Sequence, residues 1–439
     1  MNIDETLELA KWTIKIAKNY GADEAAVDII NLRSVDIEHR DGKLDKLEES
    51  IQNSLNINIY AKNRYSSHST NDLKKENLEK FISEAVSLTK YLGEDPFRKL
   101  PDPKYYIYQR IDLDLYDPEY HNVTSEQRVK VAKKLQEYTS SLNEKVVSCT
   151  SYVSDTLANS VKVRSNGFEG SLQTTTFSTQ VAASINDGKG NIPNDYGSRT
   201  SRHYNEMPDL EEMGKEVIER AIRKLGQSKI ATGVYDMIVE NRVATGLLGR
   251  LIQPMDGRLI QQNQSCFAKK IGEQIASEKL TIKDNPFIMG GLGSRLFDGE
   301  GMATRERVFF DKGVLKSFLI DNYYANKLGV EPTSSGRTNT IIEPGTKSLD
   351  ELIAGTQKGI LVTSFIGGNS NSTTGDFSTG ISGMMIENGQ IVKPINEMNI
   401  TGNLLEFWHH LAEVGNDVYK YSTWLRPSLY FKDIEISGA

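Results

Sequence analysis

The alternation of apolar and polar residues divides the first 122 residues into a helix, a pair of strands and a second helix. The first helix is predicted from apolar residues spaced three or four apart, which are Leu7, Ala10, Ile14 and Ala17, and from the capping-box spacing of Asn2 and Glu5 at its start. Strands follow, because apolar and polar residues alternate on both sides of Asp41-Gly42, a dipeptide typical of a hairpin turn. A second helix is predicted by a later stripe, which comprises Leu78, Phe81, Ala85, Val86 and Leu92.

A proline-rich segment from residue 95 to residue 122 separates this unit from the next. Its four prolines, Pro96, Pro101, Pro103 and Pro118, interrupt both helices and strand ladders. The segment is therefore predicted to be a connector that wraps over a core.

The same order of elements returns after the connector. Thr124 and Gln127 have the spacing of a capping box, and Asp209 begins a later helix. Between them, a second turn signal at Asn166-Gly167 follows Asp41-Gly42 by 125 residues. Because helix, hairpin and helix occur twice in the same order, the sequence predicts an internal duplication.

From about residue 230 the pattern changes to short strands with many glycines. Turn signals at Asp311-Lys312-Gly313 and Glu387-Asn388-Gly389 each join two strand-like runs. One helix is predicted over 243–252, ended by Pro254, and a late one from Leu404 through Leu411 to a stop at Gly415.

These patterns predict an α+β protein. Its N-terminal half is a duplicated helix, β-hairpin and helix unit, and its C-terminal domain is mainly antiparallel β with two or three helices. The predicted domains are 1–122, 123–229 and 230–439.

Composition narrows the function classes. There are 52 Lys and Arg residues against 59 Asp and Glu residues, and this net charge of -7 disfavours nucleic acid as the main ligand. No apolar run approaches a membrane span and no signal peptide opens the sequence, so a cytoplasmic protein is expected. Cys149 and Cys266 stand far apart, which excludes a disulfide scaffold, and both are expected to be inert thiols.

The six histidines lack the spacing of a zinc site. They form no HExxH motif, and none has a second histidine three to five residues later. His409 and His410 are adjacent, so on a helix they point about 100° apart and cannot chelate one ion together. Packing or solvated roles are expected for His39, His68, His121, His203, His409 and His410.

Two carboxylates, Asp298 and Glu300, lie two residues apart in a glycine-bounded segment. On an extended strand they would share a face and could hold a hard cation or act as acid and base. Arg305 and Arg307 are close in sequence, so a structural ion-pair network is the alternative that we favour.

The segment Gly367–Gly380 is the most unusual part of the sequence, being small, polar and punctuated by glycine between two predicted strands. Glycines permit close approach of a ligand's main chain, and the short polar side chains offer donors and acceptors. A peptide-contacting loop, a purely structural turn and a site with a catalytic serine are all possible, although Ser378 has no GxSxG context. The residues predicted to contact a peptide are Gly367, Gly368, Asn371, Thr374, Gly375, Asp376 and Ser378.

At this loop and in three other places the sequence resembles the TldD/PmbA family. The matching stretches, in the family's order and spacing, are Phe297–Gly301, Gly313–Asp321, Asn371–Gly380 and Ile400–Leu405. The resemblance covers nearly the whole chain. It implies a cytosolic zinc peptidase system acting on unfolded peptides, in which one type of subunit carries an HExxxH helix and a later cysteine ligand.

The resemblance also has a departure from the family's metal motif. The HExxxH helix would fall within Val243–Pro254, which has no His, Glu or Cys, and no cysteine follows Gly415. This implies a PmbA/TldE-like non-catalytic subunit that binds no zinc and pairs with a TldD-like HExxxH subunit, or with itself. The alternatives are a free-standing hydrolase using Asp298, Glu300, Asp376 or Ser378, and a peptide-binding module without chemistry.

Overall fold

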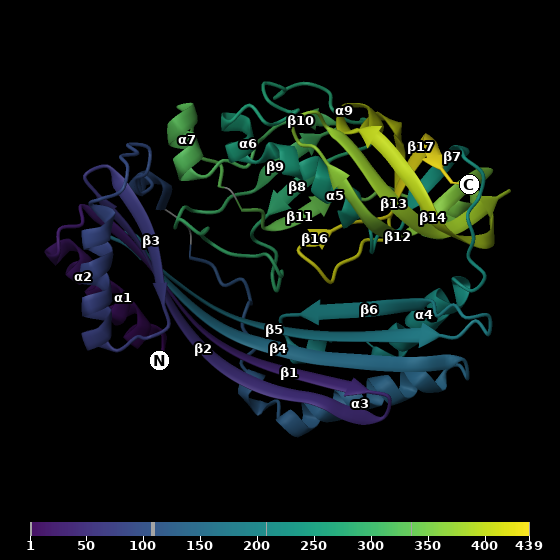
Figure 1. The fold of residues 1–439 in the computed structure, drawn as a ribbon, viewed down its shortest axis with the longest axis horizontal. Coiled ribbons are helices and arrows are strands. Elements are labelled where there is room, and N and C mark those ends of the chain that lie inside the picture. Colours follow the sequence, from purple (N-terminus) through teal and green to yellow (C-terminus); the bar gives the residue numbers. More distant parts are fainter. Residues whose placement is uncertain (1, 107–109, 208, 335, 439) are drawn as a thin grey trace.

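The computed structural model describes residues 2–106, 110–207, 209–334 and 336–438. A long, curved sheet forms the N-terminal half, and the C-terminal half is packed above one face of this sheet (Figure 1). The chain is of mixed helix and strand with mainly antiparallel sheets, so the predicted α+β class is confirmed.

The N-terminal sheet has six antiparallel strands in the order β3-β2-β1-β4-β5-β6. Their bounds are β1 Glu24–Arg40, β2 Lys43–Ala61, β3 Arg64–Thr70, β4 Val146–Arg164, β5 Glu169–Ile185 and β6 Asn194–Ser201. The two predicted hairpins are β1–β2 and β4–β5, and β1 pairs with β4 along 15 residues, from Ala26↔Arg164 to Arg40↔Thr150. The predicted duplication is therefore confirmed, and both copies share one continuous sheet. The predicted domain boundaries stay predictions.

Four helices cover one face of this sheet. They are α1 Ile3–Asn19, α2 Lys75–Thr89, α3 Ser125–Ser141 and α4 Leu210–Arg223. Odd-numbered residues of β1 are buried under them at both ends, Val27 beneath the first pair and Val35 beneath α3. Because side chains alternate across a strand, the even-numbered residues form the opposite, more polar face, toward which the C-terminal half is placed.

Two of the predicted helix starts are confirmed by their hydrogen bonds. The Asn2 side chain accepts from the Glu5 amide at 2.8 Å, and Thr124 accepts from the Gln127 amide at 3.2 Å. In both, the third residue's side chain accepts from the cap's own amide, which completes the capping box.

The connector links the sheet to the C-terminal half. The amide of Ala303 donates to the Tyr105 carbonyl, that of Gly290 to Leu113 and that of Thr175 to Leu115. Leu113 and Leu115 are buried, in agreement with a segment that wraps over a core. Residues 107–109 of the predicted connector lie outside the described part of the chain.

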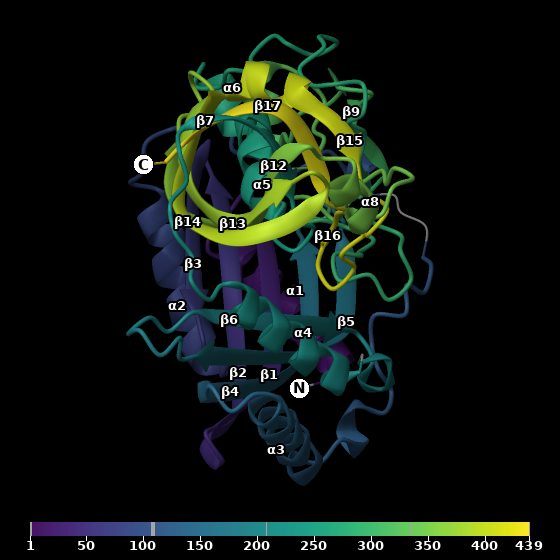
Figure 2. The ribbon, with the colours of Figure 1, turned by 90° about the vertical axis from the view of Figure 1, so that its right-hand side faces the viewer.

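A closed β-barrel organises the C-terminal half. Strands β14, β13, β12, β7 and β17 pair in that order, β14 also pairs with β17, and β15 extends β17 at the edge. Their bounds are β7 Gly233–Val239, β12 Lys358–Ser370, β13 Asp376–Glu387, β14 Gln390–Asn403, β15 Leu411–Val414 and β17 Leu429–Ser437. The ring is seen nearly end-on in Figure 2, with α5 (Thr245–Ile252) inside its outline. Leu247, Leu248 and Leu251 of α5 belong to the same core as the inward residues of the strands.

A smaller five-stranded sheet packs beside the barrel in the order β10-β9-β8-β11-β16. Its strands are β8 Ile282–Asn285, β9 Arg307–Asp311, β10 Val314–Leu315, β11 Asn339–Ile342 and β16 Trp424–Leu425. The remaining short helices are α6 Gly257–Gln261, α7 Asn322–Leu328, α8 Leu349–Ala354 and α9 Leu404–Phe407.

Two predictions for this half were wrong in detail. The late helix ends at Phe407, and Leu411–Val414 form strand β15 instead, because they pair with β17. The described residues also contain five short α-helices rather than two or three. Across the ranges that the structure describes, no helix combines the length and apolar character needed to cross a bilayer.

Candidate functional site

The glycine-rich segment forms the end of the β12–β13 hairpin. Asn371 organises the turn, since its amide donates to the Asp376 carbonyl and its carbonyl accepts from the Gly375 amide, both at 2.8 Å. Its side-chain oxygen also accepts from the Thr373 amide at 2.9 Å. The loop is thus held in one conformation by its own polar groups, as in an Asx turn.

Three glycines in this hairpin have positive φ, at Gly367 (59°), Gly368 (109°) and Gly375 (87°). A Cβ on Gly375 would lie 3.1 Å from Asn403 Oδ1, and one on Gly368 would lie 2.6 Å from the Ser378 carbonyl oxygen. These two positions therefore require glycine for both conformation and space.

The loop is fixed to two other segments. Asn403 at the end of β14 donates its Nδ2 to the Thr374 carbonyl at 2.9 Å and to Asp376 Oδ1 at 2.8 Å. On the other side, the Cys266 amide donates to the Ser372 carbonyl at 2.7 Å. Sequence reasoning missed Cys266, which lies 109 residues before Gly375 and carries no motif that would connect the two.

The groups of this loop differ in what they present to solvent. Asn371, Thr374 and Asp376 are exposed, Ser378 is half-buried and Gly375 is buried. Hydrogen bonds from the Thr374 hydroxyl and the Asn403 amide lower the pKa of Asp376, so the loop carries an exposed anion. Burial raises the pKa of the Cys266 thiol to about 11, and this thiol stays neutral near neutral pH.

Ser378 has an amide as its polar neighbour rather than a base. Its hydroxyl lies 3.2 Å from Asn399 Nδ2, and Asn399 cannot take up a proton as a general base does. The arrangement therefore gives Ser378 no activation as a nucleophile.

The second candidate pair, Asp298 and Glu300, lies in a tight turn and not on an extended strand. Asp298 Oδ1 accepts from the amides of Glu300 and Met302, at 2.9 and 3.0 Å. Glu300 points elsewhere, and its Oε2 accepts from the Asn322 amide at 2.9 Å. The expectation that both carboxylates share a face was wrong, because the glycine-bounded turn folds back after Asp298.

The predicted ion pairs of these carboxylates with Arg305 and Arg307 were also wrong. Arg307 Nη2 pairs with Asp284 at 2.7 Å, and Arg305 donates to the Pro332 carbonyl at 3.0 Å. Arg164 of the N-terminal sheet contacts the turn instead, with Nη2 2.8 Å from the Gly299 carbonyl oxygen and Nη1 2.7 Å from Asp28 Oδ1. The turn is thus part of the junction between the two halves.

Burial at this junction changes the acidity of Glu300. Loss of solvent is the main cause that raises the pKa of its carboxyl to about 8, and the neighbouring charges of Asp298 and Asp321 add to the effect. A buried carboxyl with this raised pKa is better suited to the contact between the two halves than to binding a substrate.

Comparison with known proteins assigns the family. Residues 118–225 match the model of the PmbA/TldA metallopeptidase central domain, and residues 232–438 match that of the PmbA/TldA metallopeptidase C-terminal domain. The chain belongs to the PmbA/TldD metallopeptidase family.

Individual relatives of the PmbA/TldD family match along nearly the whole chain. The metalloprotease PmbA of Escherichia coli O157:H7 is 28% identical over 421 residues, which cover 95% of this chain and 93% of PmbA. A Bacteroides thetaiotaomicron crystal structure called a modulator of DNA gyrase is 39% identical, with a TM-score of 0.96 and 99% of each chain covered. TldE from Thermococcus kodakarensis shares the fold, with a TM-score of 0.87 at 21% identity and with 98% of this chain and 100% of TldE covered.

Helix α5 occupies the place at which the resemblance puts the HExxxH helix of the PmbA/TldD family. Gly246 and Arg250 stand four residues apart on it, and both lie against Phe365 of β12. The Arg250 guanidinium folds back and donates to the Gly246 carbonyl. Just after α5, Gln253 contacts Ser370 of the hairpin at 3.5 Å, so α5 and the glycine-rich loop are neighbours.

The histidines lie away from this region or make local contacts. His39 is buried against Gln136 at 3.2 Å, and His410 Nδ1 lies 2.9 Å from the Lys432 carbonyl oxygen. Within the described ranges, no group of three or more His, Cys, Asp or Glu residues is arranged to hold a metal ion.

Proposed function

We propose that this chain is a PmbA/TldE-like non-catalytic subunit of a cytosolic peptidase, paired with an HExxxH-bearing relative that supplies the zinc. The observation that carries the proposal is Arg250. Residues four apart on a helix share a face, and in HExxxH the glutamate and the second histidine have that spacing. In this chain, the two residues with that spacing on the face toward β12 are Gly246 and Arg250. The positive charge of the Arg250 guanidinium repels a metal cation.

The role of this subunit in the pair would be to hold the peptide. The exposed main chain of residues 367–370 at the end of β12 lies beside α5, and an extended peptide binds most generally through main-chain hydrogen bonds to a strand. The residues that would contact it are those of the hairpin from Gly367 to Ser378. Unfolded peptides suit such a site because their own main-chain groups are free.

The first experiment separates this role from that of a free-standing hydrolase. Purified alone, the chain is expected to cleave no peptide and to retain no stoichiometric zinc after treatment with a chelator. Mixed with the HExxxH-bearing relative, it is expected to increase peptide cleavage. Elemental analysis that finds about one tightly bound zinc per chain would contradict the proposal, because such a ratio requires a complete set of zinc ligands.

The second experiment concerns assembly. A subunit that completes a partner's chamber needs an interface of at least about 1,600 Å² in total, which is the usual size for a stable complex. Sedimentation is therefore expected to show a dimer, with the relative or with a second copy. A strictly monomeric chain in the presence of the relative would argue against the subunit role.

A further inference from the structure

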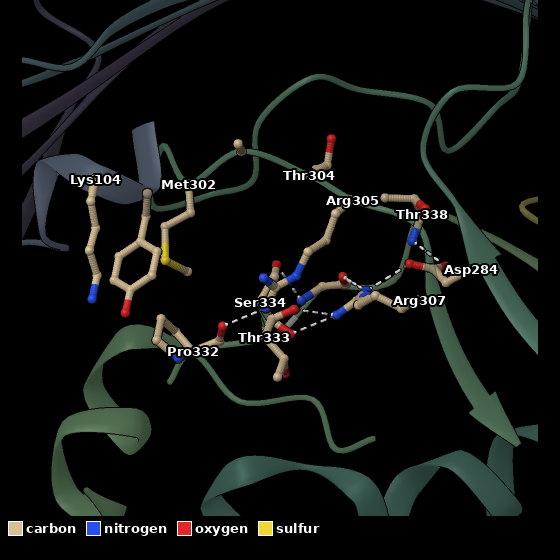
Figure 3. Close-up of a pocket in the computed structure, with 13 residues that line it drawn as sticks. Lys104, Asp284, Met302, Thr304, Arg305, Arg307, Pro332, Thr333, Ser334 and Thr338 are labelled. Atoms are coloured by element: carbon tan, nitrogen blue, oxygen red, sulfur yellow. Dashed lines mark hydrogen bonds and ion pairs between the residues drawn. The ribbon is translucent and has the colours of Figure 1, made fainter. Parts of the chain in front are cut away.

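A cavity, remote in sequence from the hairpin, lies between the connector and the small sheet. It has a volume of about 310 Å³. Lys104 and Met302 stand on one side of it, Asp284, Arg307 and Thr338 on the other, and Arg305 between them (Figure 3). The loop that begins at Pro332 forms the wall below.

One of the cations at this cavity is fully engaged. Arg307 and Asp284 form a buried ion pair at 2.7 Å, with side chains 7% and 0% exposed. Arg307 also donates to the carbonyls of Thr333 and Gly336, at 2.6 and 2.7 Å. This pair shapes the wall and leaves no net charge for a ligand.

The other cations at this cavity are less completely paired. Arg305 is exposed, and its one hydrogen bond in the described chain goes to the neutral Pro332 carbonyl. Lys104 has only an exposed partner, Glu331 at 3.3 Å, and exposed pairs contribute little.

Two more guanidinium groups stand close behind the wall. Arg295 and Arg337 have no carboxylate within ion-pair distance among the residues described, and burial lowers the pKa of each. A Cβ on Gly336, which lines the cavity, would lie 2.7 Å from Arg295 Nη2. Both guanidinium groups add positive charge near this wall, and the charges of Asp284 and Asp298 offset part of it.

An unpartnered hydroxyl is the independent sign of a ligand. Thr338 is 3% exposed and lines the cavity, yet its Oγ1 has no hydrogen-bond partner among the described residues. Buried polar atoms are normally paired, because an unpaired one loses its hydration without compensation. Thr338 lines the cavity, so a rotation of its side chain about χ1 would turn this buried hydroxyl toward a ligand oxygen, which would accept from it.

We propose that this cavity binds the carboxylate of a small molecule with an apolar group, of which the C-terminal residue of a peptide is the simplest example. A planar guanidinium such as that of Arg305 matches a carboxylate with two parallel hydrogen bonds. The buried Met302 and the ring of Pro332 offer contact to an apolar side chain, which a bare phosphate would not use. The volume lies at the lower end for ligand sites and suits one or two residues. Binding here requires no zinc and no second subunit, so it goes beyond the proposed function.

The test titrates the full-length chain alone with three probes, N-acetyl-leucine, N-acetyl-leucinamide and inorganic phosphate, and follows heat by calorimetry. N-acetyl-leucine is expected to saturate below about 10 mM, which is the weak end of ligand affinities, and to bind less tightly as salt rises. N-acetyl-leucinamide, which lacks the carboxylate, is expected not to bind. Equal binding of acid and amide, binding of phosphate alone, or no saturation by the acid would each overturn the proposal.

Two variants locate the site. Arg305→Gln is expected to lower the affinity for N-acetyl-leucine about tenfold, which is the effect of losing one charge-assisted hydrogen bond. Thr338→Val should also weaken it, while melting at the same temperature or higher, because it removes a hydroxyl that lacks a partner. Arg258→Gln, which changes an exposed arginine of α6 outside the cavity, is the matched control and should bind as the parent does. Unchanged affinity for N-acetyl-leucine in both Arg305→Gln and Thr338→Val would overturn the assignment of the binding site to this cavity.

Discussion

Two glycine-bounded turns of this protein each carry a carboxylate, and their surroundings make them opposites. Glu300 lies in the turn 297–301 under the N-terminal sheet, and burial there raises its pKa to about 8. Asp376 lies in the hairpin loop 371–376, open to solvent, and its hydrogen bonds lower its pKa. Similar local chemistry thus gives a neutral group at a junction and an anion at a surface.

The difference follows from what each turn packs against, not from the turns themselves. Arg164 reaches from β4 to the Gly299 carbonyl and closes the first turn against the sheet. The second turn is held by Asn403 and by the Cys266 amide, both within the C-terminal half, which leave its outer side chains free. The role of a turn that joins the two halves is best tested by measuring stability. The role of a turn within one half is best tested by measuring ligand binding.

The largest effect is expected from Arg164→Ala. The side chain is 2% exposed, so its removal leaves the Gly299 and Glu300 carbonyls without this buried donor and leaves Asp28 with Lys162 as its ion-pair partner. Breaking a buried pair in this way costs about 3–5 kcal/mol of unfolding free energy. Urea unfolding measures the loss, and Arg40→Ala, which changes an exposed arginine on β1, should cost far less because exposed ion pairs contribute little. Equal losses of unfolding free energy in the two variants would show that Arg164 at the junction contributes no more stability than an exposed arginine.

A pH-dependent effect comes next, from Glu300. Its carboxyl has a pKa of 4.5 when unperturbed and about 8 in the fold, so between these values the folded state binds more protons than the unfolded state. The unfolding free energy must then fall as pH rises through this window, by about 2–4 kcal/mol from pH 5 to pH 8.

Glu300→Gln should remove that slope, because the amide is neutral at every pH and can still accept from the Asn322 amide. Denaturant unfolding at several pH values measures it. The exposed Glu278→Gln is the control and should keep the parent's slope. A slope that survives in Glu300→Gln would assign the titration to another group.

Gly375→Val tests the surface turn. A β-branched residue at φ 87° costs about 1–3 kcal/mol, and the added atoms would meet Asn403. Peptide processing by the reconstituted pair is expected to fall while the dimer persists. Gly42→Val is matched in backbone, with φ 82° and open space around it, and should lower stability without affecting processing. If processing fell only in proportion to the melting temperature in both variants, the loop would be a structural turn and nothing more.

The smallest effect is expected from Ser378→Ala. The hydroxyl bonds only to the side chain of Asn399 within the described residues, so the loss should be about 0.5–1.5 kcal/mol at most. Turnover by the pair should drop mildly, as no nucleophile is removed. The exposed His409→Ala serves as a control with no expected change. Abolished turnover in Ser378→Ala, with Gly375→Val still active, would restore the serine hydrolase alternative.

Local signals in the sequence predicted the elements well, because the physics behind them is local. The capping boxes at Asn2 and Thr124, the turn at Asp41-Gly42 and the hairpin at Glu387-Asn388-Gly389 all depend on residues within four positions of one another. Those predictions were confirmed, and the duplication could be inferred from their order.

Long-range pairings could not be predicted in the same way. Leu404 to Leu411 has helical spacing, yet its second part becomes strand β15 because β17 offers it a partner. Asp298 and Glu300 were expected to pair with Arg305 and Arg307, whereas both carboxylates accept from backbone amides and Arg307 pairs with Asp284. The site also depends on Asn403, which the β13–β14 pairing brings to the loop, and on Cys266, which contacts the loop from a segment outside the barrel strands.

The position of β7 in the barrel determines when this protein can finish folding. It pairs in parallel with β12 and in antiparallel with β17, which begin 125 and 196 residues after it starts. The edge of β7 that pairs with β17 therefore stays open until β17 has left the ribosome. The N-terminal sheet and the helices that cover it need nothing beyond residue 223 and can form earlier during synthesis. The C-terminal half can close only after β17 has emerged, and its long loop closures make that step the slow one.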